Sequence, residues 1–238
     1  MSPAPARSPR LHAVTREIDA IEDLLEYADA TDPTVWTRRG DILVGTGGSV
    51  LTARLPHATG EDASAWWRAV SEAAVVDDPV RLPGTGLVAF GALPFDARSA
   101  SDGVFHVPRV VLGRRGGRSW ITRITTDDDA DAPLAAPSPY GPHWSATLGP
   151  GALTPDGYQD AVRSGLDAIA SGEVAKVVLA RDLAGSVPAG ADLRRLVRAL
   201  ATAYPDTWTF AVDGLIGASP ETLVTVSGGT VTARVLAG

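Results

Sequence analysis

The sequence predicts an α+β protein with large, mainly antiparallel sheets and flanking helices, and three observations support this prediction. Apolar residues make up 45% of the 238 residues and charged residues 21%, which is typical of a folded chain. Short alternating or apolar runs, bounded by glycine-rich turns, are typical of strands. Strands and helices also mix without a regular strand–helix–strand alternation, which argues against a parallel doubly wound sheet.

The first of three predicted regions, residues 1–125, contains most of the candidate strands. Apolar residues at helical spacing predict a helix over residues 15–28. A glycine-rich turn at residues 46–49 is expected to join strands 41–45 and 50–55 into a hairpin. A second helix is predicted to begin at Ser64 as its N-cap and to cover residues 66–75.

A glycine-punctuated apolar run at residues 86–93 precedes a second hairpin candidate, which pairs residues 107–112 with residues 119–124. The composition then becomes rich in aspartate and proline over residues 126–150. We interpret this second region as a surface linker.

The third region, residues 151–238, has the clearest pattern. Thr154 and Pro155 are typical of a helix start, and we expect that helix to end at residues 171–172. The predicted elements that follow are a strand at 174–181, a helix at 193–204, a strand at 207–212, and a hairpin of residues 222–226 with residues 230–236.

Charge and cysteine content exclude several classes of function. There are 28 acidic and 21 basic residues, so the net charge of -7 disfavours nucleic acid and anionic membranes as partners. No cysteine is present, which excludes disulfides and thiol catalysis and fits a reducing compartment. No membrane span or signal peptide is apparent, so we expect a cytoplasmic protein.

Lys176 is the only lysine among the 21 basic residues. A strand with period two would place it on one face with Val174, Val178 and Ala180, and burial there would lower the pKa of its amine. Such an amine can act as a general base, which a guanidinium cannot do. The alternatives are an edge-strand lysine that reaches solvent, or codon bias that leaves one lysine by chance.

Glu221 follows Pro220 in a predicted turn between two strands. A carboxyl beside apolar strands could have a raised pKa and act as a general acid, although a solvated turn carboxylate is the simpler interpretation. The four histidines lack the paired spacing of zinc ligands, and no glycine run has the spacing of a dinucleotide or Walker-type loop.

The chain resembles the N-terminal part of an isochorismate synthase, a member of the chorismate-utilising enzymes. Five blocks carry the resemblance: GALPFD at residues 91–96, the segment at 158–169, KVVLAR at 176–181, GASPE at 217–221, and VLAG at 235–238. The last three, in this order and spacing, are specific. The resemblance implies the chorismate-binding fold, also called the aminodeoxychorismate-synthase-like fold, in an incomplete form.

The resemblance also implies roles for individual residues. Lys176 would be the base that activates water for attack on C2 of chorismate, and Glu221 the acid that protonates the departing C4 hydroxyl. Ala237 and Gly238 would contribute to substrate binding. Related anthranilate synthases lack the lysine, and aminodeoxychorismate synthases carry a lysine where Ala237 stands, so isochorismate synthase is preferred and salicylate synthase is the nearest alternative.

Members of the family use Mg2+, and the residues that hold it lie beyond the last matched block. We therefore expect no metal site in this chain, and we expect the sequence to be a truncated product that is inactive alone. A non-catalytic remnant that binds a partner is the alternative of another class. Isochorismate feeds both menaquinone and siderophore biosynthesis, and neither the pathway nor the oligomeric state follows from the sequence.

Overall fold

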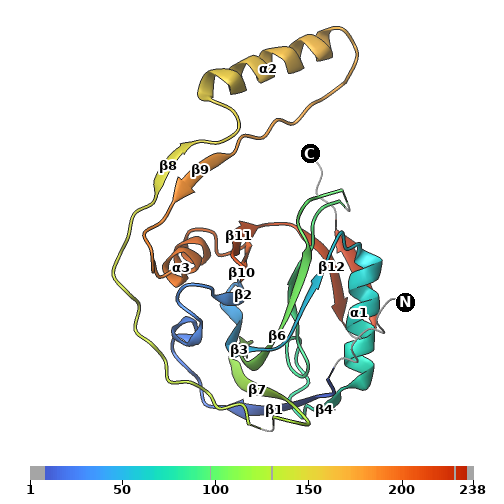
Figure 1. Cartoon of the computed structure of the whole chain (residues 1–238), viewed down its shortest axis with the longest axis vertical. Coiled ribbons are helices and arrows are strands. Elements are labelled where there is room, and N and C mark those ends of the chain that lie inside the picture. Colours follow the sequence, from blue (N-terminus) through green and yellow to red (C-terminus); the bar gives the residue numbers. More distant parts are fainter. Residues whose placement is uncertain (1–8, 97, 130, 228, 235–238) are drawn as a thin grey trace, which may run out of the picture. The chain divides into compact units, whose positions relative to one another are not determined.

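A nine-stranded sheet forms the framework of the larger part of the chain (Figure 1). The computed structural model describes residues 9–96, 98–129, 131–227 and 229–234. Two units are distinguished: unit 1 comprises residues 1–141 and 192–238, and unit 2 comprises residues 142–191. The sheet belongs to unit 1. Its strands are β1 (Leu11–Ile18), β2 (Thr34–Arg38), β3 (Asp41–Leu55), β4 (Val75–Asp77), β5 (Phe90–Ala92), β6 (Gly103–Arg115), β7 (Arg118–Thr126), β10 (Trp208–Val212) and β11 (Leu215–Ser219).

Neighbouring strands follow the order β11-β10-β2-β3-β6-β7-β1-β4, and β5 also pairs with β6. All of these pairs are antiparallel except that of β1 with β4. The predicted class, α+β with a large and mainly antiparallel sheet, is therefore confirmed. A separate two-stranded sheet in unit 1 pairs β12 (Thr222–Ser227) with β13 (Thr230–Arg234).

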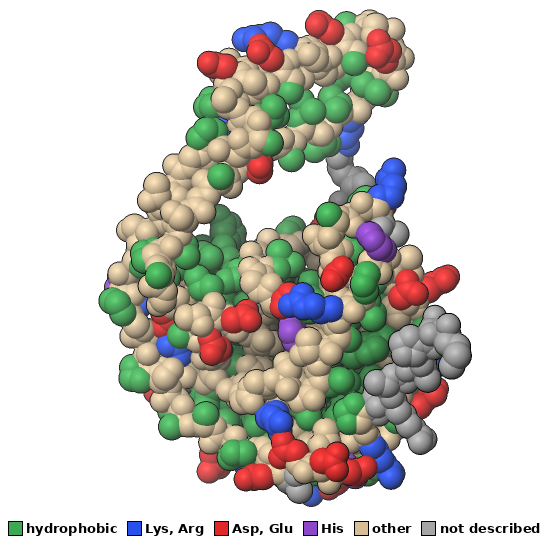
Figure 2. All heavy atoms as spheres, viewed as in Figure 1, with side chains coloured by type: hydrophobic (Ala, Val, Ile, Leu, Met, Phe, Trp, Pro, Cys, Tyr) green, Lys and Arg blue, Asp and Glu red, His purple; other side chains and the backbone are tan. Residues whose placement is uncertain are grey.

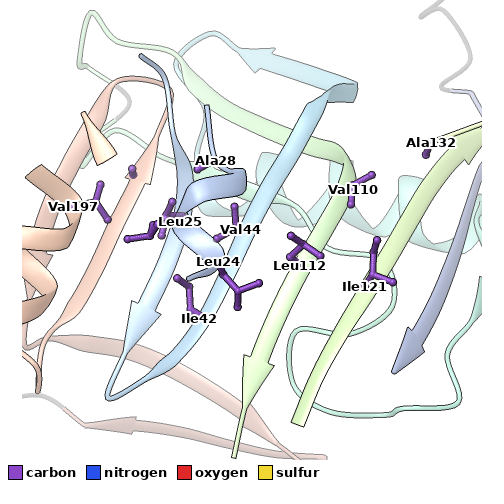
Figure 3. Close-up of a cluster of buried hydrophobic side chains, with 12 residues drawn as sticks. Leu24, Leu25, Ala28, Ile42, Val44, Val110, Leu112, Ile121, Ala132 and Val197 are labelled. Atoms are coloured by element: carbon purple, nitrogen blue, oxygen red, sulfur yellow. The ribbon is translucent and has the colours of Figure 1, made fainter. Parts of the chain in front are cut away.

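Apolar side chains that alternate along the strands bury both faces of the sheet. On β6, Val110 and Leu112 belong to one buried cluster, and Val111 between them belongs to the other. Figure 3 shows the first cluster, in which Leu24 and Leu25 of the 3-10 helix η1 (Leu24–Tyr27) meet residues of the strands. Two helices cover the sheet: α1 (Gly60–Ala73) contributes Val70 to the second cluster, and α3 (Arg194–Ala203) contributes Val197 to the first.

Unit 2 consists of one strand pair and one helix. Strand β8 (Thr147–Pro150) pairs antiparallel with β9 (Leu183–Ser186), and α2 (Pro155–Ala170) lies between them in sequence. The hydroxyl oxygen of Thr154 accepts a hydrogen bond from the N–H of Gly157, which is the N-cap that the sequence predicts. In Figure 2, charged side chains gather along one side of α2 and hydrophobic ones along the other, as an amphipathic helix requires.

Two predicted elements near the N-terminus are wrong. The helix expected over residues 15–28 is strand β1 followed by η1, because residues 11–18 form a continuous ladder with β7 that outweighs the helical spacing. The hairpin expected around residues 46–49 is a single strand, β3. Both of its halves pair with β6, so the chain does not reverse, and Gly47 and Gly48, each with φ of 74°, lie at a bulge.

Two further predictions need correction. Helix α1 begins after Thr59 rather than Ser64, because Thr59 and Asp62 form a capping box in which each side chain accepts the other's backbone N–H. The predicted strand at residues 174–181 is not a strand, since these residues pair with none of the described strands and a strand needs a ladder partner. The β6–β7 and β12–β13 hairpins, α2, α3 and β10 are confirmed within a few residues.

The predicted boundaries at residues 125 and 150 stay a prediction. Residues of the aspartate- and proline-rich stretch contribute to the core of unit 1: Ala132 is buried in the first cluster, and Leu134 and Tyr140 pack against it. This stretch leaves unit 1 at residue 141, and the chain returns to the unit at residue 192.

Candidate active site

Glu221 lies in the short connection between β11 and β12, with its side chain exposed. Its backbone N–H donates to Oγ of Ser219 at 3.2 Å. Ser219 is the last residue of β11 and pairs with Trp208, the first residue of β10. The indole Nε1 of Trp208 donates to Oγ1 of Thr222 at 2.8 Å. Pro220 and Glu221 are thus flanked by two residues tied to the β10–β11 pair: Ser219 belongs to β11, and Thr222 is hydrogen-bonded to Trp208 of β10.

Glu221 also lines a groove of about 930 Å3 between the nine-stranded sheet and the β12–β13 hairpin. The walls combine aromatic side chains, arginines and the apolar residues of the hairpin. The side chains that form these walls are Trp36, Trp208, Phe210, Arg38, Arg39, Arg114, Arg115, Leu223 and Val226. The groove therefore places positive charge next to apolar and aromatic surface.

An aromatic shelf forms one wall of this groove. Trp36 on β2 lies with its ring centroid 5.6 Å from that of Trp208 and 5.6 Å from that of Phe210. The guanidinium carbon of Arg38 lies 4.9 Å from the centroid of Trp208, within the range of a cation–π interaction. The shelf therefore offers flat apolar surface next to positive charge.

Lys176 belongs to unit 2, where it follows α2 in the segment that leads to β9. This segment runs beside the helix: the hydroxyl of Tyr158 donates to the carbonyl oxygen of Leu179 at 3.4 Å, and Gly165 leaves room for Val177. Lys176 itself is exposed, so the expectation that it is buried among small apolar side chains is wrong for this unit. The predicted neighbour Val178 is also 80% exposed.

The remaining predicted site residues and the paired roles are not decided by this geometry. Ala237 and Gly238 lie outside the described residues. Lys176 and Glu221 belong to different units, and each has its surroundings defined only within its own unit. The assignment of one as base and the other as acid stays a prediction.

The described residues do not fit a magnesium site. Among them, no group of three or more histidine, aspartate or glutamate side chains could hold a metal ion. The acidic side chains that line the Glu221 groove, Asp41 and Glu221, are accompanied there by four arginines. None of the helices that the structure describes combines the length and the apolar composition needed to span a membrane.

Several residues of the groove were not singled out from the sequence. Trp36, Ser219 and Thr222 become relevant only because β2, β10 and β11 are neighbours in the sheet. For Trp208 and Phe210 the sequence did give an indication: they alternate along the predicted strand at residues 207–212, which places both side chains on one face. That alternation alone does not say that the face borders a cavity.

Comparison with known proteins supports one family. A sequence model described as chorismate binding enzyme matches residues 4–238. A protein of Mycobacterium tuberculosis, named as a candidate isochorismate synthase MenF, is 32% identical over an alignment of 166 residues; the match covers 65% of this chain and 40% of that protein. The isochorismate synthase DhbC of Bacillus subtilis is 37% identical over an alignment of 95 residues; the match covers 35% of this chain and 24% of that protein.

Solved structures show the same fold. MenF of Escherichia coli, a menaquinone-specific isochorismate synthase, superposes with a TM-score of 0.55 at 19% identity, covering 91% of this chain and 52% of MenF. DhbC of Bacillus anthracis, named as a candidate 2,3-dihydroxybenzoate-specific isochorismate synthase, gives a TM-score of 0.55 at 22% identity, covering 87% of this chain and 49% of DhbC. The chain spans about half the length, or less, of the relatives that it matches.

Proposed function

The chain belongs to the chorismate-binding enzymes, and from this premise we propose that it is the N-terminal part of an isochorismate synthase. In this reaction, water adds at C2 of chorismate and the C4 hydroxyl leaves as water, so that the overall change is an isomerisation. Chorismate is then the small-molecule substrate. The single observation that carries the proposal is the position of Glu221, at the edge of a groove lined by arginines and aromatic rings.

Two side chains are proposed to move the protons. Lys176 takes a proton from the attacking water, and Glu221 gives a proton to the departing hydroxyl. Each role is typically worth ~100- to 10,000-fold in rate. The position of Glu221 at the edge of the groove supports its role because a donor must reach the substrate, and the arginines of the groove support binding of a carboxylate-bearing ring.

The chain alone is proposed to have negligible turnover. It spans 40% of the M. tuberculosis relative and 52% of E. coli MenF, and its described residues hold no candidate metal site. The names of the relatives point to two pathways, menaquinone and 2,3-dihydroxybenzoate synthesis.

Product analysis tests this function. Chorismate is incubated with Mg2+ and either the 238-residue chain or a version continued to the length of its relatives, and the products are separated chromatographically. We expect isochorismate from the longer version, and a loss of at least ~100-fold in Lys176→Ala and Glu221→Gln. Arg163→Gln, an exposed change on α2, is the matched control. Salicylate with pyruvate as product, or full activity in Lys176→Ala, would contradict the proposal.

One observation favours a second candidate function, association with another polypeptide without catalysis. The β12–β13 hairpin exposes 87% of Leu223, 67% of Val226 and 65% of Val231, an unusual apolar surface for two strands. Sedimentation at several concentrations tests this candidate. Two results together would favour this second function over the enzyme: association that is lost in Leu223→Ser, and no isochorismate from the longer version of the chain.

A further inference from the structure

We propose that Trp208 is a positioning residue for Glu221 and acts through its hydrogen bond to Thr222. The inference rests on the proposed function, because it assigns a support to the carboxyl that serves there as the general acid. Trp208 belongs to the nine-stranded sheet, and Thr222 is the first residue of the separate β12–β13 hairpin. The 2.8 Å bond between their side chains therefore links the two sheets directly beside Glu221.

Two hydrogen bonds bracket the glutamate. On its N-terminal side, Oγ of Ser219 accepts the N–H of Glu221 itself at 3.2 Å. On its C-terminal side, the hydroxyl of Thr222 is held by the indole of Trp208. Since Trp208 and Ser219 are paired residues of adjacent strands, both bonds originate from one place in the ladder. The backbone of Glu221 is thus fixed from both sides by a rigid element.

The indole is itself held in place. Its ring contacts Trp36 on one neighbouring strand, at a centroid separation of 5.6 Å, and carries the guanidinium of Arg38 at 4.9 Å. These contacts limit the ring of Trp208 to one orientation. Its N–H therefore already points at Thr222, and the hydrogen bond forms without a further loss of side-chain freedom. An exposed carboxylate on a short turn would otherwise sample several positions relative to a substrate, which lowers the rate of proton transfer.

Three variants separate positioning from simple stability. Trp208→Phe removes the donor and keeps an aromatic ring, Thr222→Val removes the acceptor and keeps the shape, and Thr222→Ser keeps the hydroxyl. Thr232→Val on β13, the second strand of the hairpin, makes the same chemical change away from Trp208 and serves as the matched control. Thermal melts of all four establish that the variants are folded.

The first measurement needs no turnover and uses the 238-residue chain. We expect Thr222→Val to speed hydrogen exchange of the Trp208 indole N–H about tenfold, as the loss of one hydrogen bond implies. The backbone order parameter of Glu221 should fall in Thr222→Val and Trp208→Phe and stay at the wild-type value in Thr222→Ser and Thr232→Val. An unchanged Glu221 in Thr222→Val, or the same change in Thr222→Ser, would overturn the proposal.

The second measurement uses the longer version of the chain with chorismate. Here kcat should fall about tenfold in Thr222→Val at unchanged KM and recover in Thr222→Ser, because the bond affects the acid rather than substrate binding. Trp208→Phe, which also alters a wall of the groove, should show the same fall in kcat. An equal loss of kcat in the control variant Thr232→Val would overturn the proposal. If wild type makes no isochorismate, the proposed function fails, and the order parameter of Glu221 alone decides whether Trp208 positions it.

Discussion

The carboxylate of Asp192 and the guanidinium of Arg194 form a buried ion pair, with 2.7 Å between Oδ2 and Nη2 and side-chain exposures of 3% and 1%. Arg194 also donates to the carbonyl oxygens of Ser138 and Pro139, and Asp192 accepts the N–H of Gly141 at 2.8 Å. The pair therefore fastens the start of α3 to the point where the chain leaves unit 1.

Loss of one partner of this pair should be costly. We expect Asp192→Asn to lower the free energy of unfolding by about 3 kcal/mol, because the buried guanidinium of Arg194 loses its countercharge. Denaturant-induced unfolding measures the change. The matched control is Asp206→Asn, which removes an exposed carboxylate 2.7 Å from Arg39 and should change stability by less than about 1 kcal/mol. Equal losses in the two variants would contradict a special role for the buried pair.

The same pair should make stability depend on pH. Burial alone would raise the pKa of Asp192, but hydrogen bonds from Arg194 and Gly141 outweigh it and hold the pKa below its ordinary value of 3.8. A lowered pKa in the folded state contributes stability above the unfolded pKa, and this contribution is lost as the pH falls through the folded value. Wild type should lose stability below about pH 4 more steeply than Asp192→Asn. If the stability of the two proteins fell with equal slope as the pH was lowered, Asp192 would not be responsible for the pH dependence.

Tyr140 should ionise late. Burial, together with the hydrogen bond from its hydroxyl to Asp23 at 2.9 Å, raises the pKa of Tyr140 to about 12. Since the folded pKa lies above the ordinary value of 10.0, its contribution to stability is complete below that value and is lost as the pH rises through about 12. Ultraviolet titration of tyrosinate measures this. Tyr140→Phe should remove the titration step near pH 12, and Tyr204→Phe should leave that step in place.

Gly113 on β6 is required by a close neighbour. A Cβ atom at this position would overlap the indole of Trp120, coming within 2.7 Å of its Nε1. Trp120 is only 1% exposed, so the ring has no space to move, and Gly113→Ala should cost about 1–3 kcal/mol through overpacking. Gly60→Ala at the start of α1 meets nothing within 4 Å and is the control. Similar melting temperatures for both variants would argue against the steric explanation.

Elements with local signals were predicted well. The caps of α2 at Thr154 and Pro155 involve residues only a few positions apart, so the sequence displays them directly. The same is true of the β12–β13 hairpin, whose two strands are joined by a short glycine-containing connection. The prediction that Glu221 lies in a turn was possible because the strands on both sides of it are recognisable in the sequence.

Elements that depend on distant partners were not predicted. Residues 15–28 have helical spacing, yet β1 forms because β7, more than a hundred residues later, offers a ladder along its whole length. The reverse happens at residues 174–181, whose apolar pattern is typical of a strand but which pair with none of the described strands. A strand depends on hydrogen bonds to another segment, so its own residues determine it only in part.

The sequence by itself determined the fold class, the family resemblance and the residues Lys176 and Glu221 as candidates, because motif order and hydrophobic periodicity are properties of the linear chain. Only the tertiary structure decided that Glu221 borders a groove of about 930 Å3 and is bracketed by Ser219 and Thr222. That arrangement requires β10 to lie between β2 and β11, and such neighbours are selected by burial and strand pairing across the whole unit.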